Sequence, residues 1–230
     1  MFDVPGCWTV APDIASIGPL LPVVIAEHIA WLERHGERLG DASLVEMEVK
    51  EEVDARREAE FCFAADRTPV TVGEIETAIR RMGFARRDLL DLVRELPDLV
   101  LDWRPPSSAA ARTDSWAPEI RNIREILNHI AGGDRYYRTA LLEEPTTAEL
   151  QGEGFDLAVD RQRAINHLRS LTAEDCARTL RPRRRLLSEA EEEWTVRKAL
   201  RRYICHERFH TREIQQRLAW LVLGIPSPGR

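Results

Sequence analysis

The strongest constraint on the fold is the spacing of apolar residues from residue 71 onward. In this part of the chain they recur at steps of three and four, as on the inner face of an amphipathic helix. The pattern divides into four segments, at residues 71–96, 122–142, 155–171 and 195–223. Four amphipathic helices joined by polar loops predict a helical bundle.

Residue types at the ends of these segments support the division. Asn122 can cap the second helix, and Glu125, three residues later, can return the capping hydrogen bond. Thr195 is a suitable cap for the fourth helix, and Pro97 cannot continue the first. The connections, including a polar loop over residues 172–193, are expected to lack regular structure.

The first 66 residues follow a different pattern. Cys7 to Val10 resemble a short strand, residues 14–39 have helical spacing, and residues 44–49 alternate as a half-buried strand does. We therefore expect a mostly α protein with two domains. These are a small α+β unit at residues 1–66 and a four-helix bundle at residues 67–230.

Charge and composition narrow the function classes. The 39 acidic and 33 basic residues give a formal net charge of -6, so there is no excess of positive charge to hold a nucleic acid backbone. The amino terminus lacks the basic start of a secretory signal, and we expect no apolar stretch long enough to cross a membrane. The four cysteines are far apart in the sequence, which predicts reduced thiols. A cytoplasmic protein is expected.

The sharpest chemical pattern is a pair of histidines four residues apart, His206 and His210, on the apolar face of the fourth helix. Such a pair lies one turn apart and can bind one metal ion. A buried polar group without a partner costs roughly 1 to 3 kcal/mol. Two buried imidazoles are therefore expected to have a partner, and a shared metal ion would serve as one. The alternative is that they bond to neighbouring side chains or reach solvent. His129, at the margin of the second helix's inner face, is the candidate third ligand, although a boundary histidine packing its ring would look the same.

Other titratable residues near this pattern are weaker candidates. Acidic residues close to the histidines could orient them or act as a general base, but solvated helix charges are the favoured interpretation for Asp134, Glu207 and Glu213. No catalytic residue is assigned. The remaining histidines are interpreted as surface or boundary groups, namely His28, His35 and His167. Cys205 is expected to pack beside the bundle.

Three motifs together resemble the DinB family, which is grouped with the YfiT-like metal-dependent hydrolases. They are the run from Asn122 to His129, the run from Arg202 to Ile214, and the junction at residues 96–105. The resemblance covers roughly residues 68–224. It implies a four-helix bundle, frequent dimers, and a metal site formed by His129, His206 and His210, often occupied by nickel or zinc.

The chain also departs from the family pattern. Arg121-Asn122 stands where the family commonly has Trp-Ser, and an extra segment at residues 107–119 lengthens the loop before the second helix. The first segment, with Pro5-Gly6-Cys7 and the helix that follows, is similar to the HicB-like antitoxin fold.

The leading functional hypothesis is a metal-dependent enzyme, because three imidazoles leave a coordination position open. What is known of the family implies a transferase or isomerase that uses a low-molecular-weight thiol, or a hydrolase, acting on a small molecule. The alternative is a non-enzymatic, metal-stabilised scaffold with an interaction module. A toxin-antitoxin-like regulator is disfavoured by the acidic charge.

Overall fold

The computed structural model describes residues 6–9, 13–38, 48–53, 62–104, 122–142, 145–146, 149, 154–181 and 192–223. The chain forms two compact units, Met1–Asp54 and Ala55–Arg230, and each is described by itself.

The first unit contains one long helix, α1 (Ile14–Arg34), which confirms the helix expected there. Asp13 caps it by accepting a hydrogen bond from the backbone nitrogen of Ser16 at 2.8 Å. Ile25 and Ile29 pack with Cys7. The predicted α+β character finds no support, because residues 7–9 and 48–49 adopt no strand, while Val10 and residues 44–47 lie outside the described residues.

Helix α1 corrects one expectation from the sequence. Among the described residues it is the helix long and apolar enough to cross a membrane, since Ala15–Arg34 has a mean hydropathy of 1.5. The core helix of a soluble protein and a signal sequence near the amino terminus share this length and composition. Cytoplasmic location therefore stays a prediction.

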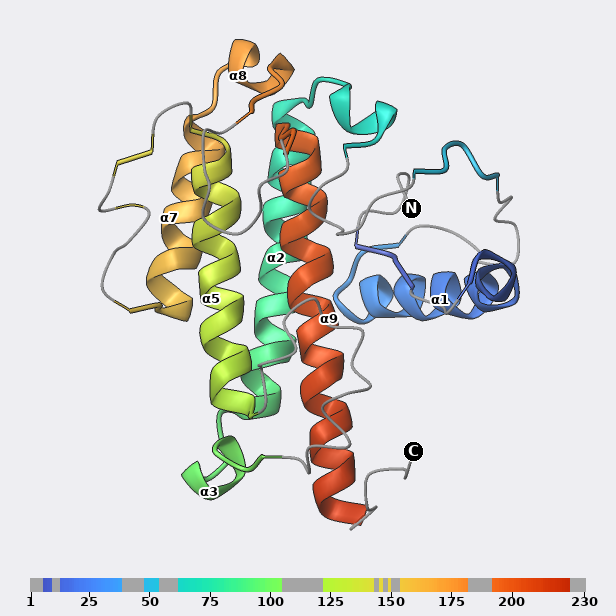
Figure 1. Cartoon of the computed structure of the whole chain (residues 1–230), viewed down its shortest axis with the longest axis vertical. Coiled ribbons are helices and arrows are strands. Elements are labelled where there is room, and N and C mark those ends of the chain that lie inside the picture. Colours follow the sequence, from blue (N-terminus) through green and yellow to red (C-terminus); the bar gives the residue numbers. More distant parts are fainter. Residues whose placement is uncertain are drawn as a thin grey trace. The chain divides into compact units, whose positions relative to one another are not determined.

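The second unit is built on four long helices that lie side by side (Figure 1). They are α2 (Val72–Val93), α5 (Ile123–Ala140), α7 (Leu157–Ser170) and α9 (Val196–Leu223). Helix α5 packs against α7 and α9, and α2 packs against the same two helices. Helices α2 and α9 run in one direction and α5 and α7 in the other. The predicted four-helix bundle is confirmed.

Local signals set where these helices begin. The backbone nitrogen of Glu125 donates to the side chain of Asn122 at 2.8 Å, and Asn122 returns a hydrogen bond to the Glu125 carboxylate, as predicted. Thr71 and Glu74 form the same arrangement at the start of α2. The predicted cap Thr195 accepts a hydrogen bond from the backbone nitrogen of Lys198 at 3.1 Å.

Short elements appear where the sequence predicted only loops. Helix α3 (Asp98–Leu101) follows α2, and α8 (Ala173–Ala177) with the bridge between Leu180 and Trp194 occupies the expected polar loop. The 3-10 helix η2 (Ala64–Arg67) is joined to α9, because Thr195 donates to the backbone oxygen of Asp66 at 2.6 Å.

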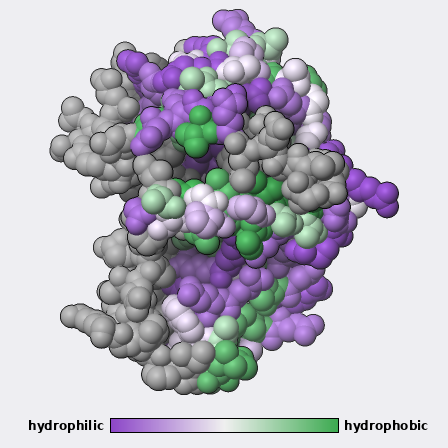
Figure 2. All heavy atoms as spheres, turned by 90° about the vertical axis from the view of Figure 1, so that its right-hand side faces the viewer, coloured by the Kyte–Doolittle hydropathy of each residue, from purple (hydrophilic) through white to green (hydrophobic). Residues whose placement is uncertain are grey.

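The apolar core lies between α2, α5 and α9, toward the end of the bundle that holds α3. Its buried residues are Leu89, Val93, Ile123, Ile126, Ile130 and Ile214. Figure 2 shows hydrophobic residues at this lower end of the molecule as well. Exposed apolar side chains there include Leu99 in α3 and Val222 and Leu223 in the last turn of α9.

Candidate metal centre

Two helices supply the three histidines that the sequence singled out. His129 lies in α5, about two turns after the cap that fixes where that helix begins. His206 and His210 lie one turn apart in α9, on the side that faces the bundle interior. The structure therefore brings together residues from two elements that are 77 positions apart in the chain.

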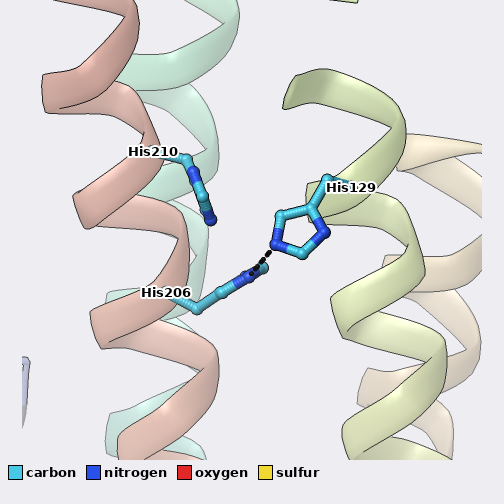
Figure 3. A group of neighbouring side chains, drawn as sticks. All are labelled: His129, His206 and His210. Atoms are coloured by element: carbon cyan, nitrogen blue, oxygen red, sulfur yellow. Dashed lines mark hydrogen bonds between the residues drawn. The ribbon is translucent and has the colours of Figure 1, made fainter. Parts of the chain in front are cut away.

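The three rings face one another between α5 and α9 (Figure 3). The Nε2 atoms of His129 and His206 are 3.0 Å apart. One ring nitrogen from each histidine can be chosen so that all three lie within 4.8 Å of one another. A metal ion with nitrogen ligands at about 2.1 Å holds those nitrogens roughly 3 Å apart. The His129–His206 pair already has this spacing, and His210 needs only a small movement to join it.

Burial keeps the imidazoles of His129 and His206 neutral. Desolvation, helped by His210, lowers the pKa of His129 from 6.5 to about 4. The same causes, with His129 as a further neighbour, hold the pKa of His206 well below its ordinary value. A neutral imidazole has one nitrogen with a free lone pair, and this is the form that binds a metal ion.

The Nδ1 atom of His210 contacts an acidic residue. This atom lies 2.7 Å from Oε2 of Glu213, and Oε1 of the same carboxylate forms an ion pair with Arg217 at 2.8 Å. Burial alone would raise the pKa of Glu213, but the bond from His210 and the charge of Arg217 lower it below its usual value. An ionised Glu213 accepts a hydrogen bond, so Nδ1 of His210 carries a proton. Nε2 of His210 is buried and has no hydrogen-bond partner.

Gly133 makes room for the His206 ring. A Cβ atom at this position would lie 2.6 Å from Cε1 and 2.9 Å from Nδ1 of His206. Any larger residue at position 133 would displace the ring. The role of Gly133 was not predicted from the sequence, although a glycine inside an amphipathic helix is a signal of close packing.

Comparison with known protein families agrees with this geometry. The family model described as the DinB superfamily matches residues 81–214, which is more than half of the chain and includes all three histidines. The chain belongs to the DinB superfamily. No curated protein and no solved structure matches it.

The match to the DinB family model begins inside α2 and ends inside α9, so it does not cover the whole bundle. Residues 1–66 fall outside it, so the HicB-like resemblance finds no support. The predicted division between the domains at residue 66 stays a prediction.

The three acidic residues near the histidines correct the sequence-based interpretation. Asp134, Glu207 and Glu213 are at most 6% exposed, so none is a solvated helix charge. Glu213 orients a candidate ligand, as described above. Asp134 and Glu207 form ion pairs with Arg86 and Arg161 in the interior of this DinB bundle.

The other singled-out residues do not join the centre. Cys205 is buried beside it, as expected. His167 lies in α7 and is half-buried, which agrees with a boundary position. His28 and His35 belong to the first unit, at α1 and its carboxyl-terminal cap. His28 is buried, so its interpretation as a surface or boundary group was wrong.

Proposed function

We propose that this DinB protein binds one divalent transition-metal ion through His129, His206 and His210 and uses it as a catalytic centre. The observation that carries the proposal is the buried Nε2 of His210, which has no hydrogen-bond partner and belongs to a ring facing two other histidines. A buried polar nitrogen without a partner is costly, and a shared ion would satisfy it.

The donor set narrows the identity of the ion. Three imidazoles without a carboxylate or thiolate suit zinc, nickel or copper better than calcium or magnesium, which prefer oxygen. Nickel or zinc is the expected occupant. When bound, the ion would supply a Lewis acid that activates a water or thiol group at an open position.

The protein's own residues would hold and shape this centre. Glu213 would keep the proton of His210 on Nδ1, so that Nε2 stays available. Gly133 would let His206 approach α5. Tyr137 would form part of the wall, since its ring meets that of His206 edge-on with centroids 5.5 Å apart.

The proposed substrate is a small molecule, with a low-molecular-weight thiol as co-substrate in a transfer or isomerisation, or water in a hydrolysis. This part of the proposal rests on the family alone. It is tested by incubating the metal-loaded protein with small electrophiles and with several small thiols, and by following turnover against the metal-free protein.

A second candidate function is a metal-stabilised scaffold without catalysis. It is favoured by one observation, namely that the three buried carboxylates nearest the histidines in sequence are all engaged by basic partners. Asp134 and Glu207 pair with arginines, and Glu213 with His210 and Arg217. Absence of metal-dependent turnover with every thiol and electrophile would favour the scaffold.

The metal site itself is tested by elemental analysis of untagged protein purified without added metal. We expect close to one ion per chain, and almost none in the variant that carries His129→Ala, His206→Ala and His210→Ala. His167→Ala is the matched control, because it removes a bundle histidine outside the centre. Equal metal content in the unaltered protein and the triple variant would refute the site.

A further inference from the structure

One charged side chain from each of the four long helices meets its partners inside the bundle. Arg86 comes from α2, Asp134 from α5, Arg161 from α7 and Glu207 from α9. All four are at most 9% exposed. Two guanidinium groups and two carboxylates balance in charge, so the group, here called the ion network, can be buried without an uncompensated charge.

Each arginine of the ion network binds both carboxylates. Arg86 donates from Nε to Glu207 at 2.5 Å and from Nη2 to Asp134 at 2.9 Å. Arg161 donates from Nε to Asp134 at 3.0 Å and from Nη2 to Glu207 at 2.5 Å. Helices α5 and α9 are therefore joined twice, once through an arginine of α2 and once through an arginine of α7.

The helices that carry the carboxylates are the helices that carry the histidines. Glu207 directly follows His206 in α9, and Asp134 lies five residues after His129 in α5. Asp134 also follows Gly133, whose backbone the His206 ring approaches. A third link at the same level is the hydroxyl of Tyr203, which donates to the backbone oxygen of Asp134 at 3.3 Å.

Apolar packing alone would fix the alignment of α5 and α9 less strictly. Contacts between aliphatic side chains are not directional, whereas a planar guanidinium that donates to two carboxylates at once requires both to lie along its N–H directions. A shift of α9 by one residue turns its side chains by about 100° and would separate both carboxylates from both arginines. The resulting unpaired charges would be buried, so the shifted alignment is strongly disfavoured.

We propose that the ion network is a positioning device that sets the alignment of α5 against α9, so that the ring of His129 meets those of His206 and His210. Its residues act through the histidines and do not touch the proposed ion. The alignment does not depend on the proposed function, and only the metal-affinity readout below rests on it.

The test replaces the whole ion network by apolar residues of similar size, Arg86→Met, Asp134→Leu, Arg161→Met and Glu207→Leu, in one variant of the full chain. Because no charge is left unpaired, a folded protein is expected. The matched control replaces another buried ion pair, Arg135→Met with Asp160→Leu. That pair joins α5 to α7 at 3.0 Å but does not involve α9.

Two readouts separate positioning from stability. The first is the affinity for Zn²⁺ or Ni²⁺, measured by competition with a chelator. We expect it to be roughly 10- to 100-fold weaker in the network variant and unchanged in the control. The second uses metal-free protein and measures the nitrogen–nitrogen coupling across the Nε2–Nε2 hydrogen bond of His129 and His206 by NMR. We expect this coupling in the unaltered protein and the control, and its loss in the network variant.

A folded network variant that keeps both the unaltered metal affinity and the nitrogen–nitrogen coupling would overturn the proposal. If this variant does not fold, the double variant Arg86→Lys with Arg161→Lys replaces it, because lysine keeps the charge but loses the fork. Unaltered coupling in the double variant would be equally decisive against the proposal. If the unaltered protein binds neither metal, the proposed function fails, and the coupling in metal-free protein still decides the positioning role.

Discussion

The ion network and the histidine centre are buried polar regions of the bundle that differ in how completely their groups are paired. In the ion network, each guanidinium binds both carboxylates and the charges balance. In the histidine centre, burial lowers the pKa values of His129 and His206, and Nε2 of His210 has no hydrogen-bond partner. The difference suggests separate roles, because a paired region adds rigidity whereas an unpaired one has capacity for a ligand.

The largest effect is expected from removing one charge of the ion network. Glu207→Leu leaves two buried guanidinium groups with one carboxylate, so we expect the free energy of unfolding to fall by about 3 to 5 kcal/mol. Urea denaturation of the metal-free protein measures it. A change close to zero would mean that the network is not paired as described. The contrast between a paired ion network and an incompletely paired histidine centre would then not hold.

The next largest effect is expected at the contact between the histidine centre and α5. Gly133→Ala places a methyl group against the His206 ring, so we expect a loss of about 1 to 3 kcal/mol in unfolding free energy and much weaker metal binding. Gly83→Ala in α2 is the matched control, because a Cβ atom there meets nothing within 4 Å. The control should gain up to about 1 kcal/mol from helix propensity. Equal behaviour of the two variants would argue against the close approach of His206.

A smaller effect is expected from the residue that orients His210. Glu213→Gln keeps an oxygen that accepts from Nδ1 but removes the negative charge, so we expect the affinity for Zn²⁺ or Ni²⁺ to fall about tenfold. Chelator competition measures it. The control is Thr211→Val, which removes a hydroxyl that donates to the backbone oxygen of Glu207. An affinity that is unchanged by Glu213→Gln would remove this residue from the centre.

The smallest effect is expected from an ion pair on the surface. Arg169 forms two hydrogen bonds from Nε and Nη2 to the one carboxylate of Glu76, and both side chains are exposed. Solvent and salt screen such a pair. Arg169→Ala should therefore leave the urea midpoint within error of the unaltered protein. A marked loss would show that an arginine–carboxylate pair stabilises this protein without burial, which would contradict the role given to burial in the ion network.

The bundle was predictable because its signals are local. Apolar spacing located all four long helices, and the capping pair of Asn122 and Glu125 gave the start of α5. Short elements such as α3 and α8 were missed, since one turn of helix leaves almost no periodic signal. In residues 1–66 the alternating residues 44–49 suggested a strand, but short alternating runs are weak evidence and no strand appears among the described residues there.

The histidine centre was predictable only in part. Spacing identified His206 and His210 and made His129 the candidate third ligand, and the resemblance to the DinB family implied that all three form one metal site. The partners of Asp134 and Glu207 were not predictable, because Arg86 lies 48 and 121 residues away in the sequence. The sequence does not distinguish a helical carboxylate that faces water from one that faces a buried arginine. The interpretation of Asp134 and Glu207 as solvated charges was therefore reasonable, but it was wrong.

The distribution of the histidines over the chain affects when an ion can be captured during synthesis. His129 leaves the ribosome first, and its partners follow 77 residues later on α9. Until α9 emerges, the growing chain would present only one of the three imidazoles of the proposed site. Metal loading would therefore be confined to the period after translation of the last long helix.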